Sequence, residues 1–213
     1  MKLHYCSDIA EGNFGDDMNS WFWDEAFPNF REIRPGTTMF GIGSILWKED
    51  IEKCDRIMVM GSGAGVGVLP KIIPDGMETC WVRGPMTAKA LDLDVSAAVT
   101  DGACLVPRLP SFSERSFTKT QRTVFVPHVS TALLPVPWEP ICDAANLSYV
   151  SPCGDSKAVI SEIAGAPLVV TESLHGAIIA DAFRVPWVPV SISPKFATFK
   201  WLDWAKSMEL DIE

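Results

Sequence analysis

Short apolar runs recur along this chain, and stretches with helical spacing separate them. The runs at residues 57–60 and 168–171 contain no charged residue, which is typical of strands buried on both faces of a parallel sheet. Similar runs predict further strands at residues 2–6, 79–82, 123–126, 147–150 and 187–190. Helices are predicted at residues 17–27, after Pro85, at 138–145, 157–164 and 174–183, and in the carboxyl-terminal tail. This alternation predicts an α/β fold with parallel sheets.

The stretch at residues 107–121 interrupts the alternation. Its sequence, PRLPSFSERSFTKTQ, is rich in proline, serine, threonine and charge and has no sustained apolar period, so we interpret it as containing a linker. The expected organisation is a Rossmann-like lobe over residues 1–110, a linker over 111–121 and a second Rossmann-like lobe over 122–213. A chain of 213 residues is long enough for two such cores.

Composition narrows the classes of function. Hydrophobic residues make up 47% and charged residues 21%, as in ordinary soluble globular proteins. The net charge of -9 argues against a nucleic-acid or anionic-membrane binder, because those partners favour a basic surface. An anionic substrate therefore needs a local basic pocket. The amino terminus becomes polar too early for a signal peptide, and no apolar run reaches roughly 18 residues, so we expect a cytoplasmic protein.

The six cysteines are scattered without a C-x-x-C pair. This spacing favours reduced thiols packed as small hydrophobic residues over a zinc site or a disulfide framework. The sequence offers no clear cluster of metal ligands, and we expect no metal.

The motif GNFGDDMN at residues 12–19 follows the first predicted strand. Gly12 and Gly15 allow close approach of the backbone, and Asp16 or Asp17 can cap the next helix and complement its dipole. A well-formed helix start explains the motif about as well as a site does. In the functional interpretation, a carboxylate orients or deprotonates a sugar hydroxyl.

The glycine-rich loop GSGAGVG at residues 61–67 is not a dinucleotide fingerprint. Val66, Val68 and Pro70 stand where G-x-G-x-x-G requires its third glycine, and the G-x-x-x-x-G-K-[ST] phosphate loop is absent too. We interpret the segment as a flexible turn, or as backbone that approaches a ligand without a dinucleotide cofactor.

Arg83 and His128 each follow a predicted strand. A guanidinium can hold a carboxylate or phosphate through two hydrogen bonds, and an imidazole at a strand end can project into a cleft. Taken alone, each residue is more often structural than functional. Arginines after strands are usually solvated or paired, and a lone histidine is more often structural than catalytic.

ESLHG at residues 172–176 is the strongest motif of the chain. His175 lies in the first turn of a predicted helix directly after a buried strand, and Gly176 leaves room for a ligand. Near a helix amino terminus the neutral imidazole is favoured, which suits proton exchange near neutral pH. No G-x-S-x-G elbow accompanies it, so hydrolase chemistry is not supported. These motifs all follow strands, and the carboxyl ends of parallel strands are where sites form.

Seven segments together resemble the polysaccharide pyruvyltransferase family, and within it the bacterial exopolysaccharide ketal-pyruvyltransferase branch of the succinoglycan type. They span nearly the whole chain in order: GNFGDDMNSWFW, FGIGSIL, VMGSGAG, WVRGPMTAKAL, AVTDGA, FVPHVS and ESLHGAIIADAFRVPWVPV. The resemblance implies two Rossmann-like lobes in the GT-B-like arrangement of glycosyltransferases, with the first lobe on the acceptor side. Relatives generally continue beyond the point where this sequence stops, so we expect a shortened second lobe.

The resemblance also implies an enzyme that moves pyruvate from phosphoenolpyruvate to a sugar of a lipid-linked oligosaccharide or polysaccharide, forming a ketal. No cofactor is implied, and the acceptor implies peripheral association with membrane-bound biosynthetic machinery at the inner face of the membrane. Carried over by motif, His175 is the implied acid/base catalyst, and Asp16 is a second catalytic candidate, for which an acceptor role is our hypothesis. The candidates for substrate binding are Arg83, His128, Asn13, Gly15, Gly63, Ser173 and Gly176.

Two other functions stay open. One is a glycosyltransferase that uses a nucleotide sugar, in which His175 and Arg83 would contact the diphosphate. The other is a noncatalytic binding lobe of a biosynthetic complex, which the short length favours.

Overall fold

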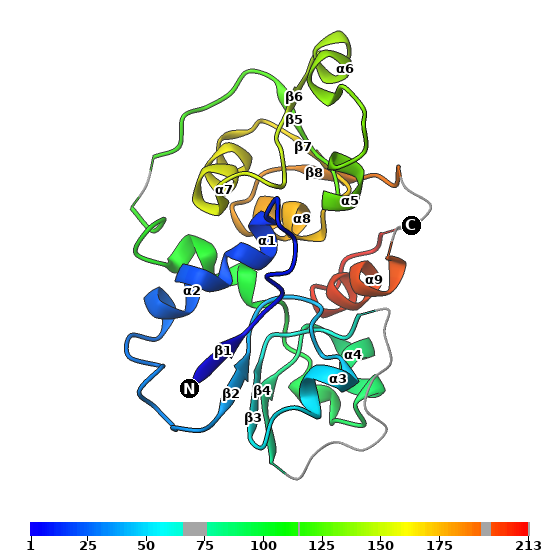
Figure 1. Cartoon of the computed structure of the whole chain (residues 1–213). Coiled ribbons are helices and arrows are strands. Elements are labelled where there is room, and N and C mark those ends of the chain that lie inside the picture. Colours follow the sequence, from blue (N-terminus) through cyan, green and yellow to red (C-terminus); the bar gives the residue numbers. More distant parts are fainter. Residues whose placement is uncertain (66–75, 115, 193–196, 213) are drawn as a thin grey trace. The chain divides into compact units, whose positions relative to one another are not determined.

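The chain folds into two compact units, each built on a sheet of four parallel strands (Figure 1). The computed structural model describes residues 1–65, 76–114, 116–192 and 197–212. Unit 1 comprises Met1–Cys6, Asn19–Gly102 and Ala197–Glu213, and unit 2 comprises Ser7–Met18 and Ala103–Phe196. The predicted α/β fold with parallel sheets is confirmed, and two such units are consistent with two Rossmann-like lobes.

The sheet of unit 1 has the strand order β1-β2-β3-β4. Its strands are β1 (Lys2–His4), β2 (Thr38–Phe40), β3 (Ile57–Met60) and β4 (Met77–Trp81). Its helices are α2 (Asn19–Ala26), α3 (Lys48–Ile51), α4 (Pro85–Ala90), α9 (Thr198–Ser207) and the 3-10 helix η1 (Val95–Ala97), and the 3-10 helix η2 (Gly102–Arg108) begins where the unit ends. Every residue of β3 is buried, which explains its charge-free sequence.

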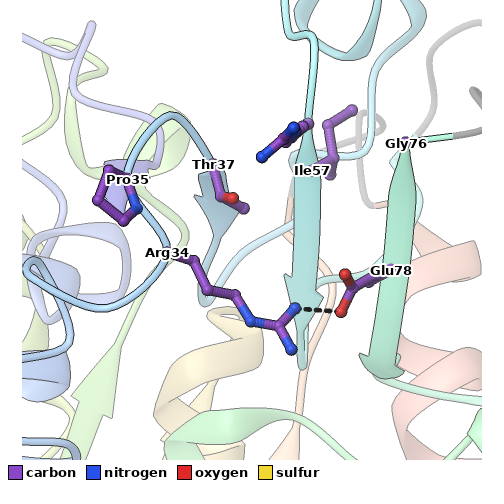
Figure 2. Close-up of a pocket in the computed structure, with 7 residues that line it drawn as sticks. Arg34, Pro35, Thr37, Ile57, Gly76 and Glu78 are labelled. Carbon is purple, nitrogen blue, oxygen red and sulfur yellow. Dashed lines mark hydrogen bonds and ion pairs between the residues drawn. The ribbon is translucent and has the colours of Figure 1, made fainter.

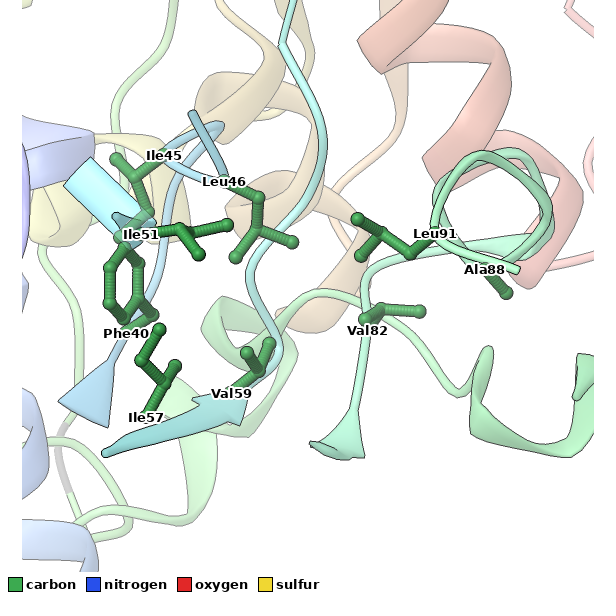
Figure 3. Packing of buried hydrophobic residues seen from close by; sticks show 9 residues of the cluster. All are labelled: Phe40, Ile45, Leu46, Ile51, Ile57, Val59, Val82, Ala88 and Leu91. Carbon is green, nitrogen blue, oxygen red and sulfur yellow. The ribbon is translucent and has the colours of Figure 1, made fainter. Parts of the chain in front are cut away.

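A cluster of buried apolar side chains packs β2 and β3 against α3 and α4 (Figure 3). Its members are Phe40, Ile45, Leu46, Ile51, Ile57, Val59, Val82, Ala88 and Leu91. Burying a side chain of this size contributes about 1.5–3 kcal/mol. The cluster therefore fixes the end of β3 and, with it, the start of the glycine-rich loop at Gly61.

The sheet of unit 2 has the order β6-β5-β7-β8, so β5 and β7 are its central strands. The strands are β5 (Thr123–Val126), β6 (Leu147–Tyr149), β7 (Val169–Thr171) and β8 (Trp187–Pro189). The helices are α1 (Phe14–Asp17), α5 (Val129–Ala132), α6 (Trp138–Ala144), α7 (Ser156–Gly165) and α8 (Leu174–Ala182). In this unit α8 follows β7 directly, as the sequence predicts.

The chain divides between the units differently from the expected lobes 1–110 and 122–213. The chain passes from unit 1 to unit 2 at residue 103. In addition, one segment from each half of the chain belongs to the unit that the other half builds. Residues 7–18 join unit 2, where α1 packs against α7. The tail joins unit 1, where α9 packs on α4 and buries Asp203. Hydrophobic periodicity reports local structure only, so it does not predict which unit a segment packs in.

Two local predictions need correction. The predicted helix over residues 17–27 is two helices, α1 and α2, and α1 starts earlier because Asn13 caps it, its side-chain oxygen accepting a hydrogen bond from Gly15 N (3.4 Å). Strand β2 was absent from the prediction because it has three residues between two glycine-containing turns. The described residues of the predicted linker, 111–121, contain no helix or strand. Val66, Val68 and Pro70 lie outside the described residues.

Candidate active site

The carboxyl edge of the unit 2 sheet gathers several of the predicted motifs. His128 follows β5, Cys153 lies in the turn after β6, and His175 lies in the turn after β7. Because these strands are parallel, their carboxyl ends meet at one edge of the sheet. This edge is the candidate site of unit 2.

The GNFGDD turn packs directly on His175. A Cβ atom built on Gly15 would lie 2.0 Å from His175 Nδ1 and 2.6 Å from its Cγ, so the ring rests on the bare backbone of Gly15. Phe14 N donates a hydrogen bond to Pro152 O (2.8 Å), which ties the turn to the end of β6. Two motifs that lie far apart in the sequence therefore meet within one unit. Only glycine fits at position 15.

The carboxylates of α1 are held by Asn13. Its side-chain nitrogen donates to Asp16 Oδ2 (2.6 Å), and its backbone N–H donates to Asp17 Oδ2 (2.8 Å). Two carboxylates thus stand in the first turn of α1, next to the backbone on which His175 rests. Negative charge in this position also complements the helix dipole.

Side-chain hydrogen bonds hold the turn that carries His175. Ser173 caps α8, its hydroxyl accepting a hydrogen bond from Gly176 N (3.3 Å), while Thr171 Oγ1 accepts from Ser173 N (3.0 Å). A Cβ on Gly176 would lie 2.4 Å from Thr171 Oγ1, so this glycine is needed for the turn itself. Substrate contacts by Ser173 and Gly176 stay predictions.

His128 is the N-cap of α5. Its Nδ1 accepts a hydrogen bond from Ser130 N (3.3 Å) and lies 2.8 Å from Ser130 Oγ. An Nδ1 that accepts from a backbone N–H leaves the proton of the neutral ring on Nε2. The backbone N–H of His128 donates to Glu172 Oε2 (3.2 Å). Whether this histidine contacts substrate stays a prediction.

Cys153 packs on the GNFGDD turn through its backbone, since its carbonyl oxygen would lie 3.4 Å from a Cβ on Gly12. Burial raises the pKa of the Cys153 thiol, and the negative charges of Glu11 and Asp17 act in the same direction. The protonated thiol is not a nucleophile at neutral pH. Packing of thiols as small hydrophobic residues holds for buried Cys142 but is wrong for Cys80, which is exposed.

Arg83 lies inside unit 1, where its guanidinium binds three partners. Nε donates to Asp203 Oδ2 (3.1 Å), one terminal nitrogen to Ser44 Oγ (2.6 Å) and the other to Ala64 O (2.9 Å). The side chain is 1% exposed. Burial lowers the pKa of Arg83 and the Asp203 carboxylate opposes that shift, so the two charges stabilise each other. A Cβ on Gly63 would lie 2.1 Å from the guanidinium carbon.

These contacts give Arg83 and Gly63 a structural role at the carboxyl edge of unit 1. Arg83 joins the loops after β2 and β3 to α9, and Gly63 is bare so that the guanidinium can lie on it. Substrate binding by either residue stays a prediction. Asp203 was missed from sequence because it lies 120 residues from Arg83 in a tail without a motif.

Glu172 is the other important side chain that sequence analysis passed over. It is 1% exposed and its carboxylate accepts backbone hydrogen bonds from two neighbouring strand ends, at His128 and Ile192. The available signal was its position, since a carboxylate directly after a buried apolar strand must find donors inside the protein.

A cavity of about 430 Å³ lies at the opposite, amino edge of the unit 1 sheet (Figure 2). It is lined by Arg34, Pro35, Thr37, Arg56, Ile57, Gly76 and Glu78. Arg34 reaches across it to an ion pair with Glu78, and both side chains are at least half exposed. None of the predicted site residues lines this cavity, so we do not assign it to the site.

Comparison with known proteins decides the family. The family model described as polysaccharide pyruvyl transferase matches residues 80–194, which is more than half of the chain and includes the ESLHG motif. This chain belongs to the polysaccharide pyruvyl transferase family. The resemblance inferred from the seven segments is thereby confirmed.

A curated relative refines the comparison. The succinoglycan biosynthesis protein ExoV of Rhizobium meliloti (strain 1021) is 42% identical to this pyruvyl transferase family member over 209 residues. The aligned part is 98% of this chain, and the chain spans 65% of the relative's length. No solved structure matches the chain.

Two further observations concern metal ligands and membrane-spanning helices in the described part of the chain. Among the described residues, no three side chains of histidine, cysteine, aspartate or glutamate lie together in a way that could hold a metal ion. No helix in the described part of the chain has the length and apolar character needed to cross a bilayer.

Proposed function

We propose that the protein transfers the pyruvyl group of phosphoenolpyruvate to two hydroxyl groups of an exopolysaccharide sugar, releasing phosphate and forming a cyclic ketal. The observation that carries the proposal is the contact of His175 with the Gly15 backbone, because it sets an acid/base side chain beside the carboxylates of α1. Family membership supports the class of reaction. The name of the relative, a succinoglycan biosynthesis protein, supports an exopolysaccharide as the acceptor class.

The proposed reaction needs an acid and then a base. A proton delivered to the methylene carbon of phosphoenolpyruvate makes the adjacent carbon electrophilic, and a first sugar hydroxyl adds there and loses its proton. The bond from that carbon to the phosphate oxygen breaks, and phosphate leaves with the electron pair. A second hydroxyl adds and loses its proton, which closes the ketal. One proton is consumed at carbon and two are released.

His175 is the proposed donor of the first proton. Its Nδ1 lies against the backbone of Gly15, and its Nε2 is shielded from bulk solvent. Exclusion of water protects an electrophilic intermediate from hydrolysis. Asp16, held by the side chain of Asn13, is the proposed base for the acceptor hydroxyl.

The anionic donor would be held by the amino-terminal turn of α8 and by His128. Free backbone N–H groups and the helix dipole favour negative charge at a helix start. Ser173, Gly176, Asn13 and Gly15 are the remaining candidate contacts in unit 2. Arg83 and Gly63 stay candidate donor contacts, although their contacts within unit 1 already account for both residues.

The test compares donors. The purified protein is incubated with phosphoenolpyruvate or with nucleotide sugars, each with lipid-linked or free oligosaccharide acceptors, while phosphate or nucleotide release and the acceptor mass are followed. We expect phosphate release only when phosphoenolpyruvate and an acceptor are both present, together with a pyruvate ketal on the acceptor. Nucleotide release from a nucleotide sugar would support a glycosyltransferase instead. Phosphoenolpyruvate binding without turnover on any acceptor would contradict the proposal and support a binding lobe.

A further inference from the structure

The three adjacent strands β5, β7 and β8 lose their regular pairing where β7 turns into α8. The last ladder bonds on the two sides of β7 run from Glu172 N to Val126 O (3.0 Å) and from Val190 N to Thr171 O (2.9 Å). In a parallel ladder, the next donors would be His128 N, toward the Glu172 carbonyl, and Ile192 N, toward the Ser173 carbonyl. Both of these N–H groups donate to a side chain instead.

The Ser173 carbonyl is already committed to the helix. It accepts a hydrogen bond from Ala177 N (3.1 Å), the first backbone bond of α8, and another from Thr171 Oγ1 (3.1 Å). The sharp turn from strand to helix thus removes an acceptor from the sheet at the level where its neighbours continue. Both N–H groups are partly buried, and a hydrogen bond of this kind contributes about 0.5–1.5 kcal/mol.

The Glu172 side chain supplies both missing acceptors. Its Oε2 accepts from His128 N at 3.2 Å, and its Oε1 accepts from Ile192 N at 2.9 Å. The carboxylate is 1% exposed and therefore acts inside the unit, between the ends of β5 and β8. A carboxylate is the side chain that can accept on two sides at once, since both of its oxygens are acceptors.

This bridge links the loop that begins at His128 to the turn that carries His175. His175 is fixed to β7 by the Ser173 cap, whereas His128 belongs to the loop after β5. Ser130 fixes the ring of His128 but not its backbone, and the backbone N–H is the group that Glu172 holds. After Val126, where the ladder between β5 and β7 ends, the bond from His128 N to Glu172 Oε2 links the loop after β5 to the turn after β7.

We infer that Glu172 is a positioning residue that holds the His128 loop, through His128 N, against the turn carrying His175. The catalytic consequence rests on the proposed function, and the hydrogen bonds themselves do not. Glu172→Gln is the informative variant, because an amide has one acceptor oxygen and its NH₂ group would face the second N–H donor to donor. Glu139→Gln, in the exposed first turn of α6 of the same unit, is the matched control.

The hydrogen bonds can be tested without turnover. In the unaltered protein, we expect NMR couplings across the hydrogen bonds from the amide nitrogens of His128 and Ile192 to the Glu172 carboxyl carbon. In Glu172→Gln, we expect amide hydrogen exchange at one or both positions to accelerate roughly 10-fold or more, with the amides of β6 unchanged. If neither coupling exists, the inference is wrong, and this arm needs no variant that folds.

The catalytic arm uses phosphoenolpyruvate turnover. Glu172→Gln should lower kcat roughly 10–100-fold while KM for phosphoenolpyruvate changes less than about 3-fold, as expected when an interaction acts on geometry and not on ground-state binding. Glu139→Gln should match the unaltered protein. Accelerated exchange with unchanged kcat would overturn the positioning role. If the unaltered protein shows no turnover of phosphoenolpyruvate, the proposed function is wrong. The hydrogen-exchange data then decide whether Glu172 holds the His128 loop.

Discussion

Removal of the Asp203 carboxylate should destabilise unit 1 severely. Asp203 is fully buried and accepts hydrogen bonds from Arg83 Nε (3.1 Å), from the backbone of Met86 and Thr87 (2.9 Å each) and from Thr87 Oγ1 (2.6 Å). Asp203→Ala leaves the guanidinium buried without its counter-charge, a change that costs about 3–5 kcal/mol. It also removes the acceptor at the start of α4, which has no side-chain cap of its own.

We therefore expect a loss of about 4 kcal/mol, most of it from the uncompensated charge. With a urea m value of about 3 kcal/mol/M for a chain of this size, the unfolding midpoint should fall by about 1.3 M. Asp203→Asn should lose less, because its amide oxygen still accepts from the α4 backbone. Asp211→Ala, an exposed carboxylate of the same tail, is the control. Equal midpoints for Asp203→Ala and Asp211→Ala would refute the assignment of Asp203 as the anchor of the tail.

Three further predictions concern unit 2. Gly15→Ala should lower turnover at least roughly 100-fold, because its Cβ would overlap His175 Nδ1, and steady-state kinetics that match the unaltered protein would rule out the contact. Ser173→Ala should cost about 1 kcal/mol of stability through loss of the α8 cap, measured by urea unfolding, and no change would exclude capping. Labelling of Cys153 by iodoacetamide should be slow at pH 7 and still rising at pH 9, because burial and Asp17 raise its pKa and keep the thiol protonated, whereas a plateau below pH 8 would contradict this environment.

The sequence predicted the elements of the sheets well because they depend on local patterns. The charge-free runs at residues 57–60 and 123–126 match β3 and β5 residue for residue. The turn after β7 was also predicted, since a buried strand and a helix follow one another directly there, whereas the capping role of Ser173 was not. Strand β2 was missed because its three residues lie between two glycine-containing turns, which interrupt any apolar run around them.

Long-range partners were not predictable in the same way. The sequence placed Arg83 at a strand end, but its environment depends on Asp203, which a separate helix brings in from the tail. The meeting of the GNFGDD turn with His175 was not predictable from the shared edge of parallel strands either, because β1 and β7 belong to different sheets. It arises because residues 7–18 join unit 2, and the contact itself depends on the missing side chain of Gly15.

The measurement that tests the central claim most directly is turnover of phosphoenolpyruvate by His175→Ala beside His4→Ala, which alters the histidine of unit 1. A general acid contributes roughly 10²–10⁴-fold to the rate, so His175→Ala should lose at least about 100-fold in kcat while its far-UV circular dichroism matches that of the unaltered protein. His4→Ala should retain activity. Full activity of a folded His175→Ala variant would contradict the account.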